Sequence, residues 1–276
     1  MKKLNAYKIF SYIILILTAI SMLVPFIWMV SSSLQSESQI FSAGLNFLPN
    51  PVTIDNYNET ITMLPVGRYF FNSLFVAVTT TVFQVIFAAM AGFAFAKLKF
   101  RFKETIFVLV LLTMMIPPQV NIIPLFFMMR ELNWIDTYQG LIVPGFFGAF
   151  GIFMMRQWFV SMPDSLIESA KLDGCSMIKI FFKIAVPLAL PAIATLTIFS
   201  FVTNYNSFMW PLIMTNSDNL RTFPVALASF KGSFRDTIEW GQLLACSVLA
   251  LVPVFAVFFA GKKYFINDIL SGGIKE

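Results

Sequence analysis

The side chains in this sequence that could do chemistry are mostly amides, hydroxyls and aromatic rings set within long apolar stretches. The sequence contains no His, which is the commonest metal ligand and the side chain best suited to proton transfer near neutral pH. Amides can hydrogen-bond to hydroxyl groups, and aromatic rings can lie against the apolar faces of sugars. These groups favour binding of a neutral, polyhydroxylated solute, so we predict no catalytic residue and no metal site.

Two clusters of such residues are candidates for a solute pathway. They are Gln119, Asn121, Asn204, Tyr205, Asn206 and Trp210. Two other interpretations stay open, because amides in membrane segments also join helices to one another, and Tyr and Trp also form belts at the membrane surface. An ion pathway is expected to show an ionisable residue in the middle of a span, and none occurs there, which favours an uncharged solute.

A short polar segment, residues 161–187, lies between apolar stretches and must therefore lie at the membrane surface, where it can contact a soluble partner. Ser161 is suited to the N-cap of a helix, and Asp164 completes a pattern like a capping box. This helix is predicted to end at about Leu172, because Gly174 can adopt the left-handed conformation that ends helices.

A second helix is predicted from about Ser176 to Val186, ended by Pro187. Its expected apolar face consists of Ile178, Phe181, Phe182 and Ala185, with Lys179 and Lys183 on the other side. Taken alone, this pattern also fits a helix that lies on the membrane with its lysines towards lipid phosphates.

The composition indicates which solvent surrounds these elements. Hydrophobic residues make up 58% of the 276 residues, the mean hydropathy is +0.79 and only 12% of residues are charged. A soluble core of this length needs far less apolar surface, so we predict an all-α membrane protein with a single transmembrane domain, residues 1–276. Two Cys give no disulfide framework, and the net charge of +5 is interpreted by its location rather than as a sign of nucleic-acid binding.

A helix needs about 20 mostly apolar residues to cross the hydrocarbon core. Six stretches qualify, namely Ile9–Val30, Tyr69–Ala96, Thr105–Met129, Gln139–Phe159, Pro187–Trp210 and Gln242–Gly261. A secretory signal has an apolar core of about 7–15 residues, whereas the first stretch is longer, so we expect that it is a retained span.

The distribution of basic residues predicts the orientation. If the amino terminus is cytoplasmic, fourteen of the 19 basic residues fall inside: Lys2, Lys3, Lys8, Lys97, Lys99, Arg101, Lys103, Arg156, Lys171, Lys179, Lys183, Lys262, Lys263 and Lys275. The other five, Arg68, Arg130, Arg221, Lys231 and Arg235, fall outside. This bias follows the positive-inside rule and predicts six transmembrane helices with both termini cytoplasmic and the 161–187 hairpin between spans 4 and 5.

Prolines predict that several spans are not regular helices. Pro117–Pro118 lies within the third stretch, Pro187 and Pro191 begin the fifth, and Pro144 and Pro253 interrupt the fourth and sixth. Proline removes a backbone donor and kinks a helix, and in a membrane the freed carbonyl groups must be satisfied by neighbouring helices or a water-filled cavity.

The hairpin also resembles a known motif. Glu168-Ser169-Ala170 and Asp173-Gly174, followed by Phe181, Ile184, Pro187 and Pro191, resemble the "EAA" loop of binding-protein-dependent ABC importer permeases. The similarity to the carbohydrate branch of that family rests on Gln119-Val120, Ile123-Pro124-Leu125-Phe126, Asp136-Thr137-Tyr138, Phe153-Met154-Met155-Arg156-Gln157, Asn206, Met209-Trp210-Pro211-Leu212 and Gly272-Gly273-Ile274-Lys275. It is strongest to the second membrane subunit of maltose-type importers and is close from about Gln119 onwards.

The resemblance implies that residues 161–187 are a coupling helix hairpin seated in a cleft of an ATPase subunit. The implied coupling residues are Glu168, Ser169, Ala170, Asp173, Gly174, Ile178 and Phe181. The implied partners are a second permease subunit, two ATPase subunits that bind ATP and Mg, and an extracytoplasmic solute-binding protein that meets Pro211–Gly241, with Gly232 as a turn. It also implies that the carboxyl tail reaches the ATPase dimer and that the protein lies in a bacterial cytoplasmic membrane.

Three positions depart from the family pattern. Ser169 replaces the middle Ala of the motif, Tyr205 stands where Trp is usual, and Asn267-Asp268 with the terminal Glu276 alters a glycine-rich ending. The first change is small, the second falls near the expected pathway, and the third weakens any inference about the tail.

These observations predict a membrane subunit of an ATP-driven importer for a sugar, and among sugars they favour an oligosaccharide. The chain has no Gly-x-x-x-x-Gly-Lys-Ser/Thr loop, so we expect no cofactor in the chain itself. The alternatives are a secondary transporter or channel for a small neutral solute that works without an ATPase, and an intramembrane enzyme, for which the usual acid–base groups are missing. Co-purification of a stoichiometric ATPase discriminates between these classes.

Overall fold

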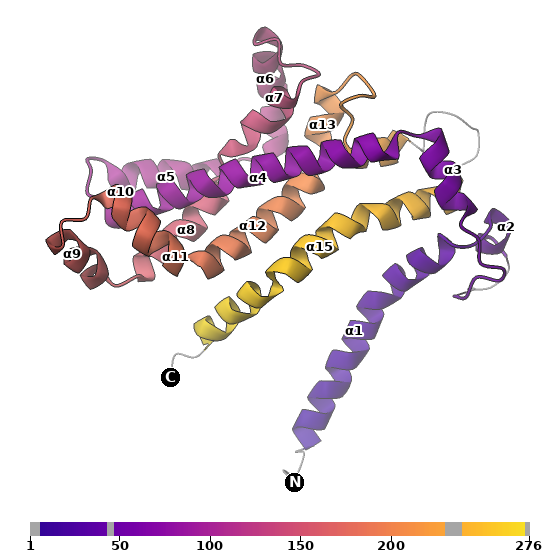
Figure 1. Cartoon of the computed structure of the whole chain (residues 1–276), viewed down its shortest axis with the longest axis horizontal. Coiled ribbons are helices and arrows are strands. Elements are labelled where there is room, and N and C mark those ends of the chain that lie inside the picture. Colours follow the sequence, from indigo (N-terminus) through magenta and orange to yellow (C-terminus); the bar gives the residue numbers. More distant parts are fainter. Residues whose placement is uncertain (1–5, 43–46, 230–238, 274–276) are drawn as a thin grey trace. The chain divides into compact units, whose positions relative to one another are not determined.

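The computed structural model describes residues 6–42, 47–229 and 239–273, with side chains as far as Lys263, and all regular structure in these residues is helical (Figure 1). The helices of the first part are α1 (Ala6–Ser32), α2 (Glu37–Ile40), α3 (Asp55–Met63), α4 (Val66–Lys97), α5 (Lys103–Thr113) and α6 (Pro118–Glu131). They are followed by α7 (Tyr138–Ile142), the 3₁₀-helix η1 (Val143–Phe146), α8 (Ala149–Ser161), α9 (Asp164–Leu172), α10 (Met177–Ile180), the π-helix η2 (Phe181–Ala185), α11 (Val186–Leu188), α12 (Leu190–Tyr205), α13 (Met209–Met214), α14 (Phe223–Ser229) and α15 (Trp240–Gly273).

Four helical segments are long and apolar enough to cross a membrane. They are Tyr7–Ser32, Val66–Lys97, Tyr138–Ser161 and Trp240–Lys263. Two further candidates are bent pairs, Lys103–Thr113 with Pro118–Glu131 at 97° and Met177–Leu188 with Leu190–Tyr205 at 77°. The described chain therefore has four candidate spans, or six if each bent pair is one span. Each overlaps a predicted stretch, although the last bent pair begins at Met177, inside the predicted hairpin, rather than at Pro187.

Prolines account for the first of these breaks. Between α5 and α6, Pro117 has an extended ψ of 132° and Pro118 begins the next helix. This agrees with the expected break, because proline has no N–H for the preceding turn and forces the residue before it out of the helical conformation. In contrast, Pro253 lies inside α15, which continues past it, as prolines in membrane helices often do.

The helices form two compact units. The smaller contains α1, α2, α3 and the first part of α15. In it, Asn56 donates to the carbonyl oxygens of Ser33 and Gln35 at 2.9 and 2.8 Å. The carboxylate of Glu37 accepts from the backbone N–H groups of Trp240 and Gly241 at 3.1 and 3.2 Å. A carboxylate at the start of α15 complements the positive end of the helix dipole.

The larger unit, residues 68–225 with the part of α15 that begins at Pro253, holds the main core. Here α5 and α12 both pack against α8 (Figure 1). The core is centred on the fully buried side chains of Met155, Phe159 and Ile180. Two helices approach closely at Gly92 of α4, where an added Cβ would lie 2.6 Å from the Met155 Cβ and 2.8 Å from the backbone nitrogen of Arg156, both in α8. Only glycine allows this separation, as at many helix contacts in membranes.

Candidate functional site

The turn at the tip of the polar hairpin has the conformation that the sequence predicted. Gly174 has φ of +75° and follows the C-cap residue Asp173 of α9. The N–H of Gly174 donates to the carbonyl oxygen of Lys171 at 3.0 Å, and the N–H of Cys175 donates to that of Ala170 at 2.9 Å. These two bonds form a Schellman motif, in which a left-handed residue satisfies the last carbonyl groups of a helix.

The second arm of the hairpin begins at Ser176, whose hydroxyl accepts from the N–H of Lys179 at 3.4 Å. It continues as α10, η2 and α11 to Leu188, so the predicted second helix is confirmed, but Pro187 lies inside it and does not end it. Its π-helical part directly precedes the α11 turn that contains Pro187. Proline cannot donate the bond that an α-helix would require at this position, so a local change in the hydrogen-bond ladder is expected here.

The predicted apolar face of this arm is confirmed for Phe181 and Ala185 and wrong for Ile178 and Phe182. Ile178 and Phe182 are 72% and 59% exposed, while Ile180, Phe181 and Ala185 are buried. The buried face begins at Met177 rather than Ile178, and the repeat of three and four residues then runs through Ile180, Phe181, Ile184 and Ala185. The arm therefore packs on the core and leaves other apolar side chains uncovered.

The hairpin presents a mixed surface around its tip. The exposed residues include Glu168, Ser169, Asp173 and Gly174, together with three large apolar side chains, Leu172, Ile178 and Phe182. Leu172 is 89% exposed. Exposed apolar side chains gathered beside charges are typical of protein interaction sites. We call the surface formed by these seven residues the docking surface.

Two of the predicted coupling residues lie beneath the docking surface rather than in it. Ala170 is 6% exposed and Phe181 is 8% exposed, and both belong to the main core. Their role in this structure is to hold the two arms of the hairpin against the rest of the unit.

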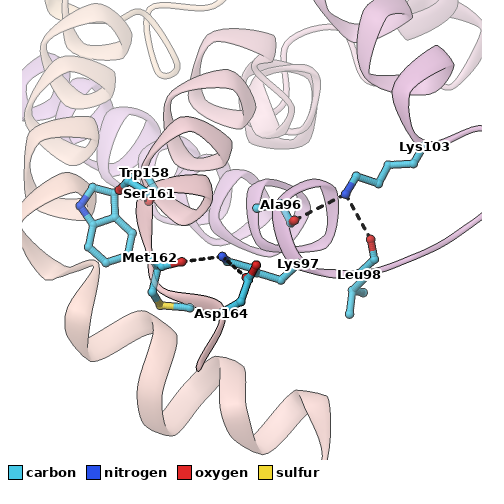
Figure 2. Close-up of polar contacts among 8 residues, drawn as sticks. All are labelled: Ala96, Lys97, Leu98, Lys103, Trp158, Ser161, Met162 and Asp164. Atoms are coloured by element: carbon cyan, nitrogen blue, oxygen red, sulfur yellow. Dashed lines mark hydrogen bonds and ion pairs between the residues drawn. The ribbon is translucent and has the colours of Figure 1, made fainter. Parts of the chain in front are cut away.

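The base of the hairpin differs from the prediction. Ser161 does not cap α9, because it is the last residue of α8 and its hydroxyl donates to the carbonyl oxygen of Trp158 at 2.7 Å. The N-cap is Pro163, which makes no side-chain hydrogen bond. Asp164 instead forms an ion pair with Lys97 of α4 at 2.6 Å (Figure 2). The hydrogen bond and charge of Lys97 lower the pKa of the Asp164 carboxyl below its usual value.

A second ion pair lies nearby. The Nη2 of Arg156 in α8 donates to both carboxylate oxygens of Glu104 in α5, at 3.0 and 3.3 Å. The guanidinium carbon lies 4.0 Å from the centre of the Phe107 ring. Arg156 lies near the end of the fourth predicted stretch. The sequence identified Arg156 and Lys97 only as cytoplasmic charges, so their partners Glu104 and Asp164 were not predicted.

The predicted pathway residues are not all brought together. Asn204 of α12 donates to the Thr81 hydroxyl and the Gln84 side-chain oxygen of α4, both at 3.1 Å. Gln119 and Asn121 lie exposed on α6. The contacts of Asn204 agree with the interpretation that amides join helices, since its N–H donors are directed to α4.

The two aromatic residues predicted for the pathway, Tyr205 and Trp210, both pack or hydrogen-bond within the protein. Tyr205 is 3% exposed and stacks on Phe201, and its buried hydroxyl has no partner in the structure. The indole N–H of Trp210 donates to the carbonyl oxygen of Gly140 at 3.0 Å. Asn206 is exposed. Thr81 was missed by the sequence analysis, although Ala77, Thr81 and Gln84 recur at helical spacing along one face of α4.

At the other end of α4, polar side chains hold the segment that follows α13. The buried amide of Asn72 accepts from the Tyr138 hydroxyl at 2.6 Å and donates to the carbonyl oxygens of Asn219 and Arg221, both at 2.9 Å. The hydroxyl of Ser73 accepts from the N–H of Phe223 at 2.7 Å. We call Asn72, Ser73, residues 136–138 and residues 215–223 the loop end of the unit.

Asp136 in this loop end has φ of +55° and accepts from the N–H groups of Asn216 and Ser217 at 3.0 and 3.2 Å and from the Ser217 hydroxyl at 3.1 Å. Burial, the largest influence, raises the pKa of Asp136, but the hydrogen bonds from Ser217 and Asn216 together outweigh it and the pKa is lowered. Gly232, predicted as a turn, and the tail residues from Ile274 lie outside the described residues. The side chains of Asn267 and Asp268 are likewise not described.

No group of three or more Cys, Asp or Glu residues in the described ranges could hold a metal ion. The geometry therefore offers a docking surface, two ion pairs at its base, an amide contact between α4 and α12, and a hydrogen-bond network at the loop end. Each of these is an arrangement for binding or for transmitting movement.

Comparison with known proteins supports this interpretation. Residues 84–269 match the family of binding-protein-dependent transport system inner membrane components. The chain is 34% identical to the arabinooligosaccharides transport system permease protein AraQ of Bacillus subtilis (strain 168), over 98% of this chain and 97% of that protein. It is 30% identical to the lactose transport system permease protein LacG of Rhizobium radiobacter, over 97% and 96% of the two chains.

A relative for a charged solute is also similar. The sn-glycerol-3-phosphate transport system permease protein UgpE of Yersinia enterocolitica is 28% identical over 95% of this chain and 96% of that protein. Among solved structures, a chain of a bacterial ABC transporter involved in the import of the acidic polysaccharide alginate superposes with a TM-score of 0.83 at 25% identity. That match covers 94% of this chain and 96% of the other.

Proposed function

The chain belongs to the family of binding-protein-dependent transport system inner membrane components, and from this premise we propose that it forms half of the pathway by which an ATP-driven importer takes up an oligosaccharide. It is a multi-pass protein of the cytoplasmic membrane and a permease subunit, not itself the ATPase. We further propose which solute it carries, which subunits it binds and which residues transmit the movement.

The observation that carries the proposal is the docking surface. Glu168 and the apolar side chains of Leu172, Ile178 and Phe182 stand out from a hairpin whose other face is buried in the core. A hairpin that only lay on lipid would not need to be anchored in this way. We infer that the docking surface seats in a cleft of an ATPase subunit, with Glu168 facing a basic residue of that partner.

The proposed topology has six spans. The bent pair Lys103–Thr113 with Pro118–Glu131 is taken as one span, and of the other pair only Leu190–Tyr205 is taken as a span, because Met177–Leu188 is the second arm of the hairpin. This places the hairpin on the same side as the basic turn after α4, with Lys97, Lys99, Arg101 and Lys103. This side is the cytoplasm by the positive-inside rule. Both termini then lie in the cytoplasm, and the loop end faces the extracytoplasmic binding protein.

The proposed assembly contains this chain, a second permease subunit, two ATPase subunits that bind ATP and Mg, and the solute-binding protein. The proposed solute is a neutral oligosaccharide, because the centres of the spans carry amides, hydroxyls and rings but no ionisable side chain. Relatives named for arabinooligosaccharides and lactose support this choice, while the relative named for glycerol phosphate defines the alternative to test.

Reconstitution of the four kinds of subunit in proteoliposomes tests the proposal. We expect uptake of a radiolabelled arabinooligosaccharide or lactose that requires ATP hydrolysis and the binding protein. Uptake that proceeds equally well without the ATPase subunits would instead establish a secondary transporter or channel. Binding of glycerol phosphate rather than any sugar by the associated binding protein would overturn the choice of solute.

A further inference from the structure

Lys97 is the last residue of α4, and its ammonium group is enclosed at the base of the hairpin. The side chain is 5% exposed, while that of its partner Asp164 is 77% exposed. The ammonium group also donates to the carbonyl oxygen of Met162 at 2.6 Å (Figure 2). Lys97 therefore binds two residues at the start of α9: it donates to the backbone carbonyl oxygen of Met162 and forms an ion pair with the carboxylate of Asp164.

The same end of α4 also contacts the second arm of the hairpin. The ring of Phe93 lies 5.2 Å from that of Phe181 in η2 and 5.4 Å from that of Phe159 in α8. Phe93 and Lys97 are four residues apart and so lie on the same side of the helix. The end of α4 thus holds both arms of the hairpin, one by packing and the other by an ion pair.

At a greater distance along α4 lies the contact with α12. Thr81 and Gln84, which bind Asn204, belong to the same uninterrupted helix as Lys97. Thirteen residues of α-helix separate Gln84 from Lys97, which corresponds to about 20 Å. A continuous helix transmits a displacement over this length without a joint.

We propose that Lys97 is a positioning residue for transport: it ties the base of the coupling hairpin to α4, so that movement imposed on the hairpin reaches the Thr81–Gln84–Asn204 contact in the membrane. The inference rests on the proposed function, because it takes the hairpin as the part that the ATPase moves. It adds a route through α4, which precedes the hairpin in the chain, to the direct route through α12, which follows it.

The chemistry of the contact suits this role. The hydrogen bond to the Met162 carbonyl oxygen fixes the position of the ammonium group. The ion pair with Asp164 therefore has a defined geometry, unlike a pair of two flexible surface side chains. A neutral side chain at position 97 would leave α9 held to α4 only through packing. The hairpin could then move at its base without moving α4 by the same amount.

The test uses the assembled importer in proteoliposomes and measures solute taken up per ATP hydrolysed. We expect Lys97→Gln and Asp164→Asn to lower this ratio, by about tenfold for the former, while ATPase subunits still co-purify and ATP hydrolysis continues. Lys97→Arg should retain most of the coupling. Lys99→Gln, two residues further along in the same basic turn, is the matched control and should leave the ratio unchanged.

A cross-link separates positioning from a structural role. With Cys175 and Cys246 replaced by Ser, the pair Lys97→Cys and Asp164→Cys should be uncoupled until a short bis-thiosulfonate reagent joins the two positions, and coupled afterwards. An unchanged ratio in Lys97→Gln, or no recovery on cross-linking, would overturn the proposal. If Lys97→Gln does not assemble, Asp164→Asn carries the test, since its carboxylate is exposed. Failure of the wild-type complex to transport would instead refute the proposed function.

Discussion

The two ends of α4 are held by different kinds of interaction. At the hairpin end, Lys97 forms an ion pair with the exposed carboxylate of Asp164. At the loop end, Asn72 and Ser73 form neutral hydrogen bonds, three of them with backbone groups of residues 219–223. Removal of Lys97 leaves behind a carboxylate that is 77% exposed and can be hydrated, whereas removal of Asn72 leaves buried polar groups without that partner, which is costly. The difference indicates that the loop end maintains the fold and the hairpin end directs movement.

The largest effect should follow from changing the turn of the hairpin. Gly174→Val should abolish uptake while the protein still inserts, because a side chain in the left-handed conformation costs about 1–2 kcal/mol and distorts the docking surface. An added Cβ at Gly174 meets no atom within 4 Å, so a clash is not the cause. Uptake and ATPase rates check this prediction.

Gly174→Asn is the informative companion, because Asn tolerates the left-handed conformation and should retain most of the transport. Gly67→Val serves as the control, since Gly67 also has free space around it but no positive φ. Normal uptake in Gly174→Val would contradict the assignment of the turn.

Reversing the charge of the docking surface should have the next largest effect. Glu168→Lys should reduce the amount of ATPase that co-purifies and abolish coupling, because a like charge would then face the basic residue of the partner. Glu168→Gln should give an intermediate result. If Glu168→Lys keeps its ATPase and its uptake, Glu168 does not face the ATPase.

A change at the loop end should instead lower stability. Asn72→Ala removes the partner of the Tyr138 hydroxyl and of two carbonyl oxygens, and we expect a loss of about 2 kcal/mol or more in the free energy of unfolding. Thermal unfolding in detergent measures it. Lys97→Gln should be less destabilising than Asn72→Ala, and the opposite order would break the comparison between the two ends.

The smallest effect is a pH dependence at the loop end. Because the pKa of Asp136 is lowered in the folded state, its contribution to stability is present above the pKa of an unfolded Asp, about 3.9, and is lost as the pH falls through the lower folded value. Asp136→Asn should therefore flatten the decrease of the unfolding temperature below about pH 4. Transport per ATP near neutral pH should not change, and an identical pH profile in the variant would refute the role of this carboxylate.

Features that depend on neighbouring residues were predicted well from the sequence. The left-handed Gly174 and the break at Pro117–Pro118 follow from backbone preferences that each residue carries with it. The apolar character of the four unbroken spans is equally local. The face of the second arm was wrong for Ile178 because Met177 and Ile178 are both apolar, and only packing decides which of them is covered.

Features that depend on distant residues could not be predicted. Lys97 and Asp164 are 67 positions apart, and Asn204 is 120 positions from Gln84. Local spacing contains no information about such pairs, so Ser161 seemed the better cap for α9, and Asn204 was grouped with Gln119 because both are amides. The coupling residues were chosen by a fixed motif, whereas the pathway residues were chosen only by residue type.

The close approach of α4 and α8 at Gly92 has a consequence for how these helices can rotate. The contact extends to both sides of Gly92, because a Cβ on Gly151 of α8 would lie 3.0 Å from that of Ala88 in α4, and the Phe93 and Phe159 rings lie 5.4 Å apart. Lys97, five residues beyond Gly92, extends this row of contacts to Met162 just past the end of α8. Several contacts in a row fix the angle between two helices, so loss of Lys97 should leave the crossing angle unchanged and free only the end of α4 nearest the hairpin.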